Sequence, residues 1–339
     1  MKKQIALIFG SVNNEHDISV ASAASVFEHF PFDLYDMVPI YIAKSGVWYT
    51  GNYTLDAMKN NTLDKEEHSE LWLQFDQKNP GFIKANDYSF VKVDGAFIML
   101  HGRMGEGGEI QGLLNSANIP FTGCDTLSAA VCMDKYFTHL ICESIGIPMA
   151  PFKFLTKDIA YDPNDFEYPL IVKPTREGSS YGVMYVDSAD KLVEAVNTVF
   201  TFDDRILIEG YIKGTEVGIG ILKTKNEFII GEMDQVNVSG DIFDFQEKYH
   251  PHATKTLRVS EFPLEVHEKV KEYSRQIFHV LDARLFSRLD FFIDEDHNIF
   301  FNEINTIPGF TSTSRYPNMI DTKGIDYPNL ILKMIEDIL

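Results

Sequence analysis

The sequence predicts an α/β protein of more than one domain, and three observations support this fold class. The chain has 339 residues, which is too many for one hydrophobic core and enough for two or three domains. In the first third, short apolar runs alternate with segments of helical periodicity, as in a parallel sheet covered by helices. Beyond residue 124 the order changes to strand, loop and strand followed by a helix, which indicates a different, α+β type of domain.

The first domain is predicted to span residues 1–124 and to be Rossmann-like with a parallel sheet. Its first strand, at residues 5–9, ends in Gly10 and precedes a polar turn and the helical pattern of "DISVASAASVFEHF". The runs "MVPIYIA" and "VDGAFIMLHG" supply further buried strands, whereas residues 51–90 are polar and too weakly patterned for any prediction. The apolar run at 5–9 is too short for an export signal, so we expect a buried strand and no signal peptide.

The rest of the chain is predicted as follows, in order. "GCDTLSAAVCMDKYFTHLICESIGIP" is a helix that leads into a new domain, and "YPLIVKPTREGSSYGVMYV" is strand, loop and strand. A helix runs from Ser188 to Phe200, and "DRILIEGYIKGTEVGIGIL" is strand, connector and strand. "HEKVKEYSRQIFHVL" is an amphipathic helix, and it leads into the hairpin "RLDFFIDEDHNIFFNEIN".

Composition and charge limit the partners and the compartment. Lys and Arg number 30 against 50 Asp and Glu, a net charge of −20, which argues against nucleic acid and anionic membrane surfaces as partners. No apolar run is long enough to span a bilayer. Three cysteines without a CxxC pair fit a reducing cytoplasm better than a disulfide framework.

The hairpin near the C-terminus carries four polar residues among Phe and Ile. If its turn lies over residues 295–298, Asp290 opposes Glu303 and Arg288 opposes Asn305, and all four share one face. Two opposed carboxylates repel each other, and a hard dication with oxygen ligands would relieve this. Alternatively, Arg288 and Asn305 only neutralise the acids on a solvated face. The apolar surroundings favour the metal site, because unpaired acids are costly in a buried sheet.

Small residues and scattered charges suggest a phosphate site. The loop in "VKPTREGSSYGV" offers backbone N–H donors above Lys173, although an ordinary turn would read the same. It returns to a strand, so it is neither a Walker loop nor a dinucleotide fingerprint. Lys135, Glu209 and Glu216 are unremarkable singly, but with Lys173 they provide two cations for phosphates and an acid for ribose.

Two further segments have both a functional and an ordinary interpretation. Glu15, in the turn "GSVNNEHD", can hold a substrate ammonium or merely face the dipole of the following helix. "IFDFQEKYHPHATKTL", with Lys248 and Tyr249, can be a lid that excludes water or a surface loop.

Eight motifs, in order and spacing, resemble the D-alanine–D-alanine ligases of the ATP-grasp superfamily. They are "NNEHDIS", "LHGRMGEGGEIQG", "MDK", "IVKPTREGSSYG", "EGYIKGTE", "FDFQEKY", "SRLDFF" and "NEINTIPGFTSTSRYP". The resemblance implies an ATP-grasp fold behind a Rossmann-like N-terminal substrate domain at 1–124. It implies a central domain at 125–208, a catalytic domain at 209–339 with a lid at about 236–256, and a cytoplasmic homodimer.

The resemblance also implies an activity, the joining of D-alanine to a second D-amino acid for peptidoglycan precursors. ATP phosphorylates the carboxylate of the first D-alanine, and the amine of the second substrate attacks the acyl phosphate. ATP is therefore a substrate. Two Mg²⁺ ions, which Mn²⁺ can replace, neutralise the charge of phosphoryl transfer.

Site residues follow from the resemblance by position. The ATP-binding residues are Lys135, Lys173, Glu177, Ser179, Ser180, Glu209, Tyr211, Ile212 and Glu216, and the metal ligands are Asp290, Glu303 and Asn305. The substrate-binding residues are Glu15, His101, Phe243, Lys248, Ser314 and Arg315. Arg288 and the backbone N–H of Gly309 would stabilise the oxyanion. Glu15, Ser179 and Tyr249 would link the lid to the first domain.

The acceptor subsite departs from the housekeeping members of this family. In "STSRYPNM", Arg315 stands where those members generally carry an apolar residue. Arg315 with Phe243, and the presence of Tyr249, is similar to the vancomycin-resistance D-alanine–D-serine ligases. A guanidinium can bond a serine hydroxyl, whereas a methyl group would leave that donor unpaired. We therefore expect D-serine as the favoured second substrate, with a housekeeping D-alanine–D-alanine ligase as the alternative.

Other classes fit the residues less well. The Glu15 turn and the "FDFQEKY" segment argue against another ATP-grasp ligase. A non-catalytic nucleotide-binding regulator would have lost at least one of five residues, and none is missing: Lys173, Arg288, Asp290, Glu303 and Asn305. A dinucleotide-dependent oxidoreductase would need the GxGxxG fingerprint, which is absent.

Overall fold

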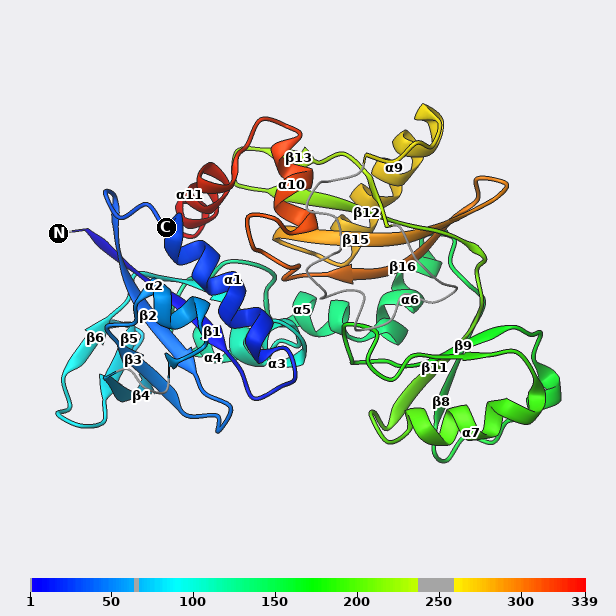
Figure 1. Ribbon diagram of the computed structural model, residues 1–339, viewed down its shortest axis with the longest axis horizontal. Helices are drawn as coiled ribbons and strands as arrows, with labels where there is room; N and C mark the ends of the chain where they lie inside the picture. Colours follow the sequence, from blue (N-terminus) through cyan, green and yellow to red (C-terminus); the bar gives the residue numbers. More distant parts are fainter. Residues whose placement is uncertain (1, 64–66, 237–258) are drawn as a thin grey trace.

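The computed structural model describes residues 2–63, 67–236 and 259–339, which form three sheets in succession along the chain (Figure 1). A seven-stranded sheet comes first, then a four-stranded sheet, then a five-stranded sheet. The predicted residues Phe243, Lys248 and Tyr249, and nearly all of the predicted lid, lie outside the described residues. The predicted domain limits stay predictions.

The first sheet is only partly parallel. Its strands are β1 (Lys3–Gly10), β2 (Tyr35–Ile42), β3 (Trp48–Gly51), β4 (His68–Gln74), β5 (Gly81–Lys84), β6 (Phe90–Lys92) and β7 (Gly95–Met99). Strand β1 lies between β2 and β7 and is parallel to both. The prediction of a parallel sheet is wrong for β3 to β6, which add to β2 in antiparallel order. Two of these strands, β4 and β5, lie within residues 51–90, where short, partly exposed strands carry little apolar periodicity.

Helices accompany the first sheet. They are α1 (His16–Glu28), α2 (Leu55–Lys59), α3 (Arg103–Glu106) and α4 (Glu109–Ser116). Strands β1 and β7 are parallel, so their carboxyl ends lie at the same edge of the sheet. The candidate active site lies at this edge. The loop after β1 carries Glu15, and the loop after β7 carries His101.

Two helices, not one, lead out of the first sheet. They are α5 (Thr126–Met133) and α6 (Lys135–Ser144), and Asp134 between them has an extended backbone. The predicted single helix is therefore wrong at this residue. The Asp134 carboxylate accepts hydrogen bonds from the N–H groups of Tyr136 and Phe137, as an N-cap does. This break puts Lys135 at the first turn of α6.

The second sheet has the order β10, β9, β11, β8. Its elements are β8 (Phe152–Thr156), a 3-10 turn η2 (Pro163–Asp165), β9 (Leu170–Pro174), β10 (Met184–Val186), α7 (Ala189–Val199) and β11 (Arg205–Gly210). The predicted strand–loop–strand and the helix between Ser188 and Phe200 are confirmed, with these two residues as the helix caps.

The third sheet has the order β13, β12, β15, β16, and β14 pairs with β12. Its elements are β12 (Gly214–Lys223), β13 (Phe228–Ile230), β14 (Asp234–Gln235), α9 (Leu264–Val280), β15 (Leu285–Asp294), β16 (Ile299–Asn305), α10 (Arg315–Asp321) and α11 (Tyr327–Ile338). The predicted helix before the hairpin and the hairpin itself are confirmed.

The C-terminal helices pack on the first sheet. Phe310, Tyr316 and Tyr327 belong to the same buried cluster as the strand residues of β1 and β7. The Phe310 ring lies 5.9 Å from Phe97 and 5.8 Å from Phe286, measured between ring centroids. Figure 1 accordingly places both ends of the chain beside the first sheet. The predicted first and third domains thus share one core.

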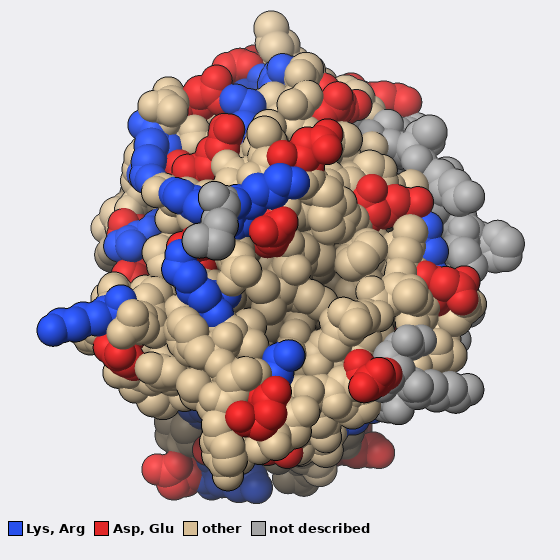
Figure 2. All heavy atoms as spheres, turned by 90° about the vertical axis from the view of Figure 1, so that its left-hand side faces the viewer, with Lys and Arg blue, Asp and Glu red and all other residues tan. Residues whose placement is uncertain are grey.

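The end of the molecule that carries the first sheet shows both signs of charge. Lys and Arg side chains lie among Asp and Glu in the upper half of this view, and much of the remaining surface is uncharged (Figure 2). Of the helices in the described part of the chain, none is long and apolar enough to cross a membrane.

Candidate active site

The hairpin of β15 and β16 pairs its polar residues as predicted. Arg288 opposes Asn305 and Asp290 opposes Glu303. Closer to the turn the predicted register is wrong by one residue, because a β-bulge follows Asp290. The bulge leaves Asn302 unpaired, and its Oδ1 accepts a hydrogen bond from Lys173 Nζ at 3.2 Å.

The bulge also decides which phenylalanines face the site. Phe292 opposes Phe300, and both line a pocket beside Glu303. Phe301 also borders this pocket but is almost fully buried, in the core of the third sheet. Without the extra residue, Phe301 instead of Phe300 would share a face with Glu303.

Asp290 is the most enclosed acid of the hairpin. Arg288 donates to it from Nε to Oδ1 at 2.8 Å and from Nη2 to Oδ2 at 2.7 Å, and Asn305 Nδ2 donates to Oδ2 at 2.9 Å. Burial alone would raise the pKa of Asp290, but the Arg288 guanidinium outweighs it and keeps that pKa below its ordinary value. Asp290 is thus ionised and held in place by its strand neighbours.

The donor set on this face has the chemistry of a magnesium site. The described residues contain no cluster of three or more His, Cys, Asp or Glu that could hold a metal. Two opposed carboxylates, from Asp290 and Glu303, together with the amide of Asn305 are nevertheless oxygen ligands on one face. Mg²⁺ favours a few such ligands and takes its others from water and phosphate, so the residues fit the ion.

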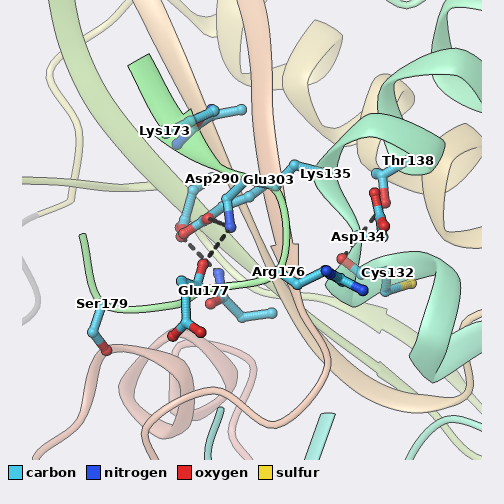
Figure 3. A network of polar contacts seen from close by, with 12 residues as sticks. Cys132, Asp134, Lys135, Thr138, Lys173, Arg176, Glu177, Ser179, Asp290 and Glu303 are labelled. Atoms are coloured by element: carbon cyan, nitrogen blue, oxygen red, sulfur yellow. Dashed lines mark hydrogen bonds and ion pairs between the residues drawn. The ribbon is translucent and has the colours of Figure 1, made fainter. Parts of the chain in front are cut away.

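A pocket of about 320 Å³ lies between the second and third sheets. It is lined by every residue predicted to bind ATP except Ser179. Figure 3 shows the side chains of Lys173, Lys135, Asp290 and Glu303 converging at one end of this region, with the Glu177–Ser179 loop beside them. Its lining combines charged side chains, which suit phosphates, with aliphatic and aromatic ones such as Ile171 and Phe292.

Two buried atoms in this pocket lack hydrogen-bond partners among the described residues. They are Glu209 Oε1 and His139 Nδ1, which lie 3.5 Å apart. Burial lowers the pKa of His139, so the imidazole is neutral. Lys173 Nζ holds the other Glu209 oxygen at 2.7 Å. A buried acceptor without a donor calls for a ligand that supplies one.

The Lys135 ammonium forms an ion pair with Glu303, one of the two opposed carboxylates of the hairpin. Its Nζ lies 3.3 Å from Glu303 Oε2 and donates to the Glu177 backbone oxygen at 2.8 Å. Its backbone N–H donates to Thr175 O at 2.9 Å. The position of this cation therefore depends on the break between α5 and α6.

A hydrogen bond joins the first sheet to the loop after β9. Ser179 Oγ donates to Glu15 Oε1. Ser179 and Ser180 both have positive φ, +54° and +60°, a backbone conformation that residues other than glycine rarely adopt. Gly102, at φ +70°, faces the same carboxylate, and a Cβ there would collide with Glu15 Oε2. Two of the three members of the predicted Glu15–Ser179–Tyr249 link are thus in contact.

His101 and Glu106 flank Glu15. Both His101 nitrogens are engaged, Nδ1 with Ile307 O at 2.9 Å and Nε2 with Ser22 Oγ at 2.8 Å. Burial lowers the pKa of His101, so the ring is neutral. Its predicted substrate role is therefore one of position and shape, since neither nitrogen is open to a further in-plane bond.

Glu106 is a candidate that the sequence reasoning missed. Its carboxylate accepts hydrogen bonds from Ile307 N at 3.0 Å and Gly102 N at 3.1 Å. Desolvation and then the charge of Glu15 raise the pKa of Glu106 to about 7. The only sequence signal was its place in "GEGGE", which a surface turn would match equally well.

The predicted acceptor residues gather around the start of α10. Ser314 Oγ accepts from Thr311 N at 3.0 Å, and a Cβ on Gly309 would lie 3.4 Å from the same oxygen. Arg315 is fixed by Asp234, which no sequence pattern indicated, from Nε at 2.7 Å and from Nη2 at 2.6 Å. Only glycine at position 218 leaves room for this pair, since a Cβ there would meet Arg315 Nη2.

Together the pocket, the two lysines and the opposed carboxylates define the class: an ATP-dependent ligase with the ATP-grasp fold. The family models described as "D-ala D-ala ligase N-terminus" and "D-ala D-ala ligase C-terminus" match residues 4–124 and 141–336, and the chain belongs to the D-alanine–D-alanine ligase family. The predicted fold, family and enzyme class are confirmed.

Relatives of two kinds are similar to the chain. The vancomycin B-type resistance protein VanB of Enterococcus faecalis is 36% identical over 340 residues, covering 98% of each chain. The crystal structure of the VanG D-Ala:D-Ser ligase from Enterococcus faecalis has a TM-score of 0.91 and 34% identity, covering 100% of each chain. The D-alanine–D-alanine ligase from Bacillus anthracis complexed with ATP has a TM-score of 0.72 and 28% identity, covering 99% of this chain and 96% of that one.

Proposed function

We propose that this enzyme makes D-alanyl-D-serine for peptidoglycan precursors through an acyl phosphate. ATP occupies the pocket between the second and third sheets, with its phosphates toward Lys135 and Lys173. The unpartnered Glu209 Oε1 and the neutral His139 lie where an adenine amino group would supply the missing donor. Glu216, at the same wall, is suited to the ribose hydroxyls.

Lys173 has two neighbours that nucleotide would rearrange. Its Nζ is shared by Glu209 Oε2 at 2.7 Å and Asn302 Oδ1 at 3.2 Å. A phosphate would compete with Glu209 for the Lys173 ammonium. The Glu209 carboxylate would then turn toward adenine and accept a hydrogen bond from it. We predict that Lys173 binds phosphate and that Glu209 binds adenine. The two roles are compatible because the Lys173–Glu209 ion pair would lie between the phosphates and the adenine.

Asp290, Glu303 and Asn305 would hold Mg²⁺, which supplies neutralisation of the phosphate charge during transfer. To bind the ion, Asp290 would give up part of its contact with Arg288, and Glu303 would give up its contact with Lys135. Both cations then remain beside the reacting groups. Arg288 and the Gly309 N–H are placed to stabilise the oxyanion formed when the amine attacks the acyl phosphate.

Glu15 binds the ammonium of the first D-alanine in this proposal. Glu15 lies in the loop between β1 and α1, and its carboxylate accepts a hydrogen bond from Ser179 and faces Gly102. The Glu15–Ser179 bond closes the phosphate loop over the first substrate, so that loop closure and D-alanine binding share one acid. Tyr249 and Lys248 remain assigned to the lid and Phe243 to the acceptor subsite, as predicted from the resemblance.

The observation that carries the acceptor choice is the fixed Arg315. Asp234 holds its Nε and Nη2 at 2.7 and 2.6 Å, so the guanidinium is oriented before any substrate arrives. An oriented donor favours an acceptor with a hydroxyl and is left unpaired by a methyl group. The similarity to the VanG D-Ala:D-Ser ligase supports the same choice.

The test is a steady-state competition between D-serine and D-alanine for the second position, with ATP and Mg²⁺. We expect the higher kcat/KM for D-serine, and Arg315→Leu should shift the preference toward D-alanine. A higher kcat/KM for D-alanine in the unaltered enzyme would identify a housekeeping D-alanine–D-alanine ligase instead.

We further propose a cytoplasmic homodimer built from domains at 1–124, 125–208 and 209–339. The three cysteines, Cys124, Cys132 and Cys142, are free and buried, which agrees with a reducing compartment. Sedimentation measurements would test the dimer.

A further inference from the structure

Arg315 touches three carboxylates, and they belong to different parts of the site. Two of its nitrogens, Nε and Nη2, are bound by Asp234. The third, Nη1, lies 3.5 Å from Glu216 Oε1 and 3.8 Å from Asp290 Oδ1. The residue proposed for the acceptor hydroxyl is thus in contact with the residues proposed for ribose and for Mg²⁺.

The three contacts differ in strength. Asp234 is buried on β14, and its Oδ1 also accepts from Gly218 N at 3.1 Å, so this carboxylate is fixed. Its two bonds to Arg315 have the geometry of a strong bidentate pair. The distances from Nη1 to Glu216 and Asp290 exceed those of good hydrogen bonds. Nη1 is therefore the part of the guanidinium that can change partners without moving the rest.

Ligands act on both of the weak contacts. Ribose hydroxyls donate hydrogen bonds to a carboxylate, so a bound nucleotide draws Glu216 toward the ribose and away from Nη1. A dication bound by Asp290 likewise weakens the electrostatic attraction between that carboxylate and the Arg315 guanidinium. Both changes leave Nη1 with donor capacity and without a competing anion.

We propose that Glu216 is a positioning residue for acceptor specificity: nucleotide binding releases Arg315 Nη1 from Glu216 and makes it available to the hydroxyl of the second substrate. This inference rests on the proposed function, because it takes the assignments of the ribose, metal and acceptor positions from it. It adds that the nucleotide site and the acceptor subsite are coupled through one guanidinium.

Coupling of this kind is reciprocal. If nucleotide raises the affinity for a hydroxylated acceptor, that acceptor raises the affinity for nucleotide by the same factor. D-Alanine has no hydroxyl to occupy Nη1, so it contributes nothing to this part of the coupling. The effect can therefore be measured as binding, without turnover.

The experiment titrates the full-length enzyme calorimetrically with the Mg²⁺ complex of β,γ-imido-ATP at saturating D-alanine, with and without an excess of D-serine. We expect D-serine to tighten nucleotide binding about fivefold or more. The 2′,3′-dideoxy form of the same analogue should show a smaller tightening, because it cannot draw Glu216 away. Equal tightening for both analogues, or none for either, overturns the proposal.

Two matched variants separate this role from simple nucleotide binding. Glu216→Gln removes the competing charge, so D-serine should affect both analogues alike. Glu177→Gln alters an acid that lines the same pocket and is not among the three acids paired with Arg315; it should weaken the binding of both analogues and keep the difference between them. If Glu216→Gln keeps the full difference, the proposal is wrong.

The same samples, supplied with ATP, report the proposed function separately. Products formed from mixed D-serine and D-alanine reveal which acceptor is favoured. Predominant D-alanyl-D-alanine would refute the D-serine assignment, whereas the dependence of nucleotide affinity on the ribose hydroxyls and on Glu216 decides the coupling.

Discussion

Arg288 and Asp290 lie two residues apart on β15 and form a bidentate ion pair, with Nε–Oδ1 at 2.8 Å and Nη2–Oδ2 at 2.7 Å. Alternation along the strand places both side chains on the face that carries Glu303 and Asn305. One guanidinium thus fixes the acid proposed to bind magnesium while lying where the oxyanion would form. Removing either partner should reveal which role dominates.

Arg288→Ala should slow the chemical step more than it weakens nucleotide binding. Loss of an oxyanion donor lowers kcat by about 10²- to 10³-fold, whereas Asp290 and Glu303 remain for Mg²⁺. Glu303→Gln should impair both quantities, because it removes a ligand charge. Rapid-quench kinetics and nucleotide titrations measure the two effects. Arg288→Lys, which keeps the charge and loses the fork geometry, is the control, and equal losses in the Ala and Gln variants would contradict the division.

Ser179→Ala should raise the KM for D-alanine more than the KM for ATP. The lost hydrogen bond to the Glu15 carboxylate is charge-assisted, and such a bond accounts for about tenfold or more in binding. Ser180→Ala is the matched control, because Ser180 lines the nucleotide pocket and should affect ATP first. Initial-rate measurements with each substrate varied would show the contrast, and the same pattern in both variants would contradict it.

Glu106→Gln should flatten the dependence of stability on pH. The pKa of Glu106 is raised from 4.5 to about 7 in the folded protein, so the folded state keeps a proton that the unfolded state has already lost. Stability therefore falls as pH rises from 4.5 to about 7, by at most about 3 kcal/mol. Urea denaturation across this range would measure it. Glu109→Gln, an exposed position on α4, should keep the slope, and an unchanged slope in Glu106→Gln would refute the assignment.

Asp234→Asn should reduce the preference for D-serine in the same direction as Arg315→Leu. The amide keeps the size of the carboxylate but weakens both bonds to the guanidinium, so Arg315 is no longer held in one orientation. We expect about a tenfold drop in kcat/KM for D-serine and a smaller change for D-alanine. Competition assays measure the ratio. Asp321→Asn, exposed at the end of α10, serves as the control and should leave the ratio unchanged.

The sequence alone determined much of the local structure and the membership of the site. Alternation of apolar and polar residues predicted β15 and β16 with the opposed pair of Asp290 and Glu303. Ser188 and Phe200 were correctly expected at the ends of α7. These features depend on periods of two and 3.6 residues and on caps, which are properties of neighbouring residues. The motifs likewise supplied residues that the fold collects in one pocket.

Only the tertiary structure decided the features that depend on distant contacts. Asp234 and Arg315 are 81 residues apart in the chain and meet because β14 and α10 both pack on β12. The raised pKa of Glu106 needs the neighbouring Glu15 and the loss of water around it. The bulge after Asp290 depends on a single extra residue in a ladder. Burial, ion pairing and register are settled by packing between elements, and no local pattern encodes them.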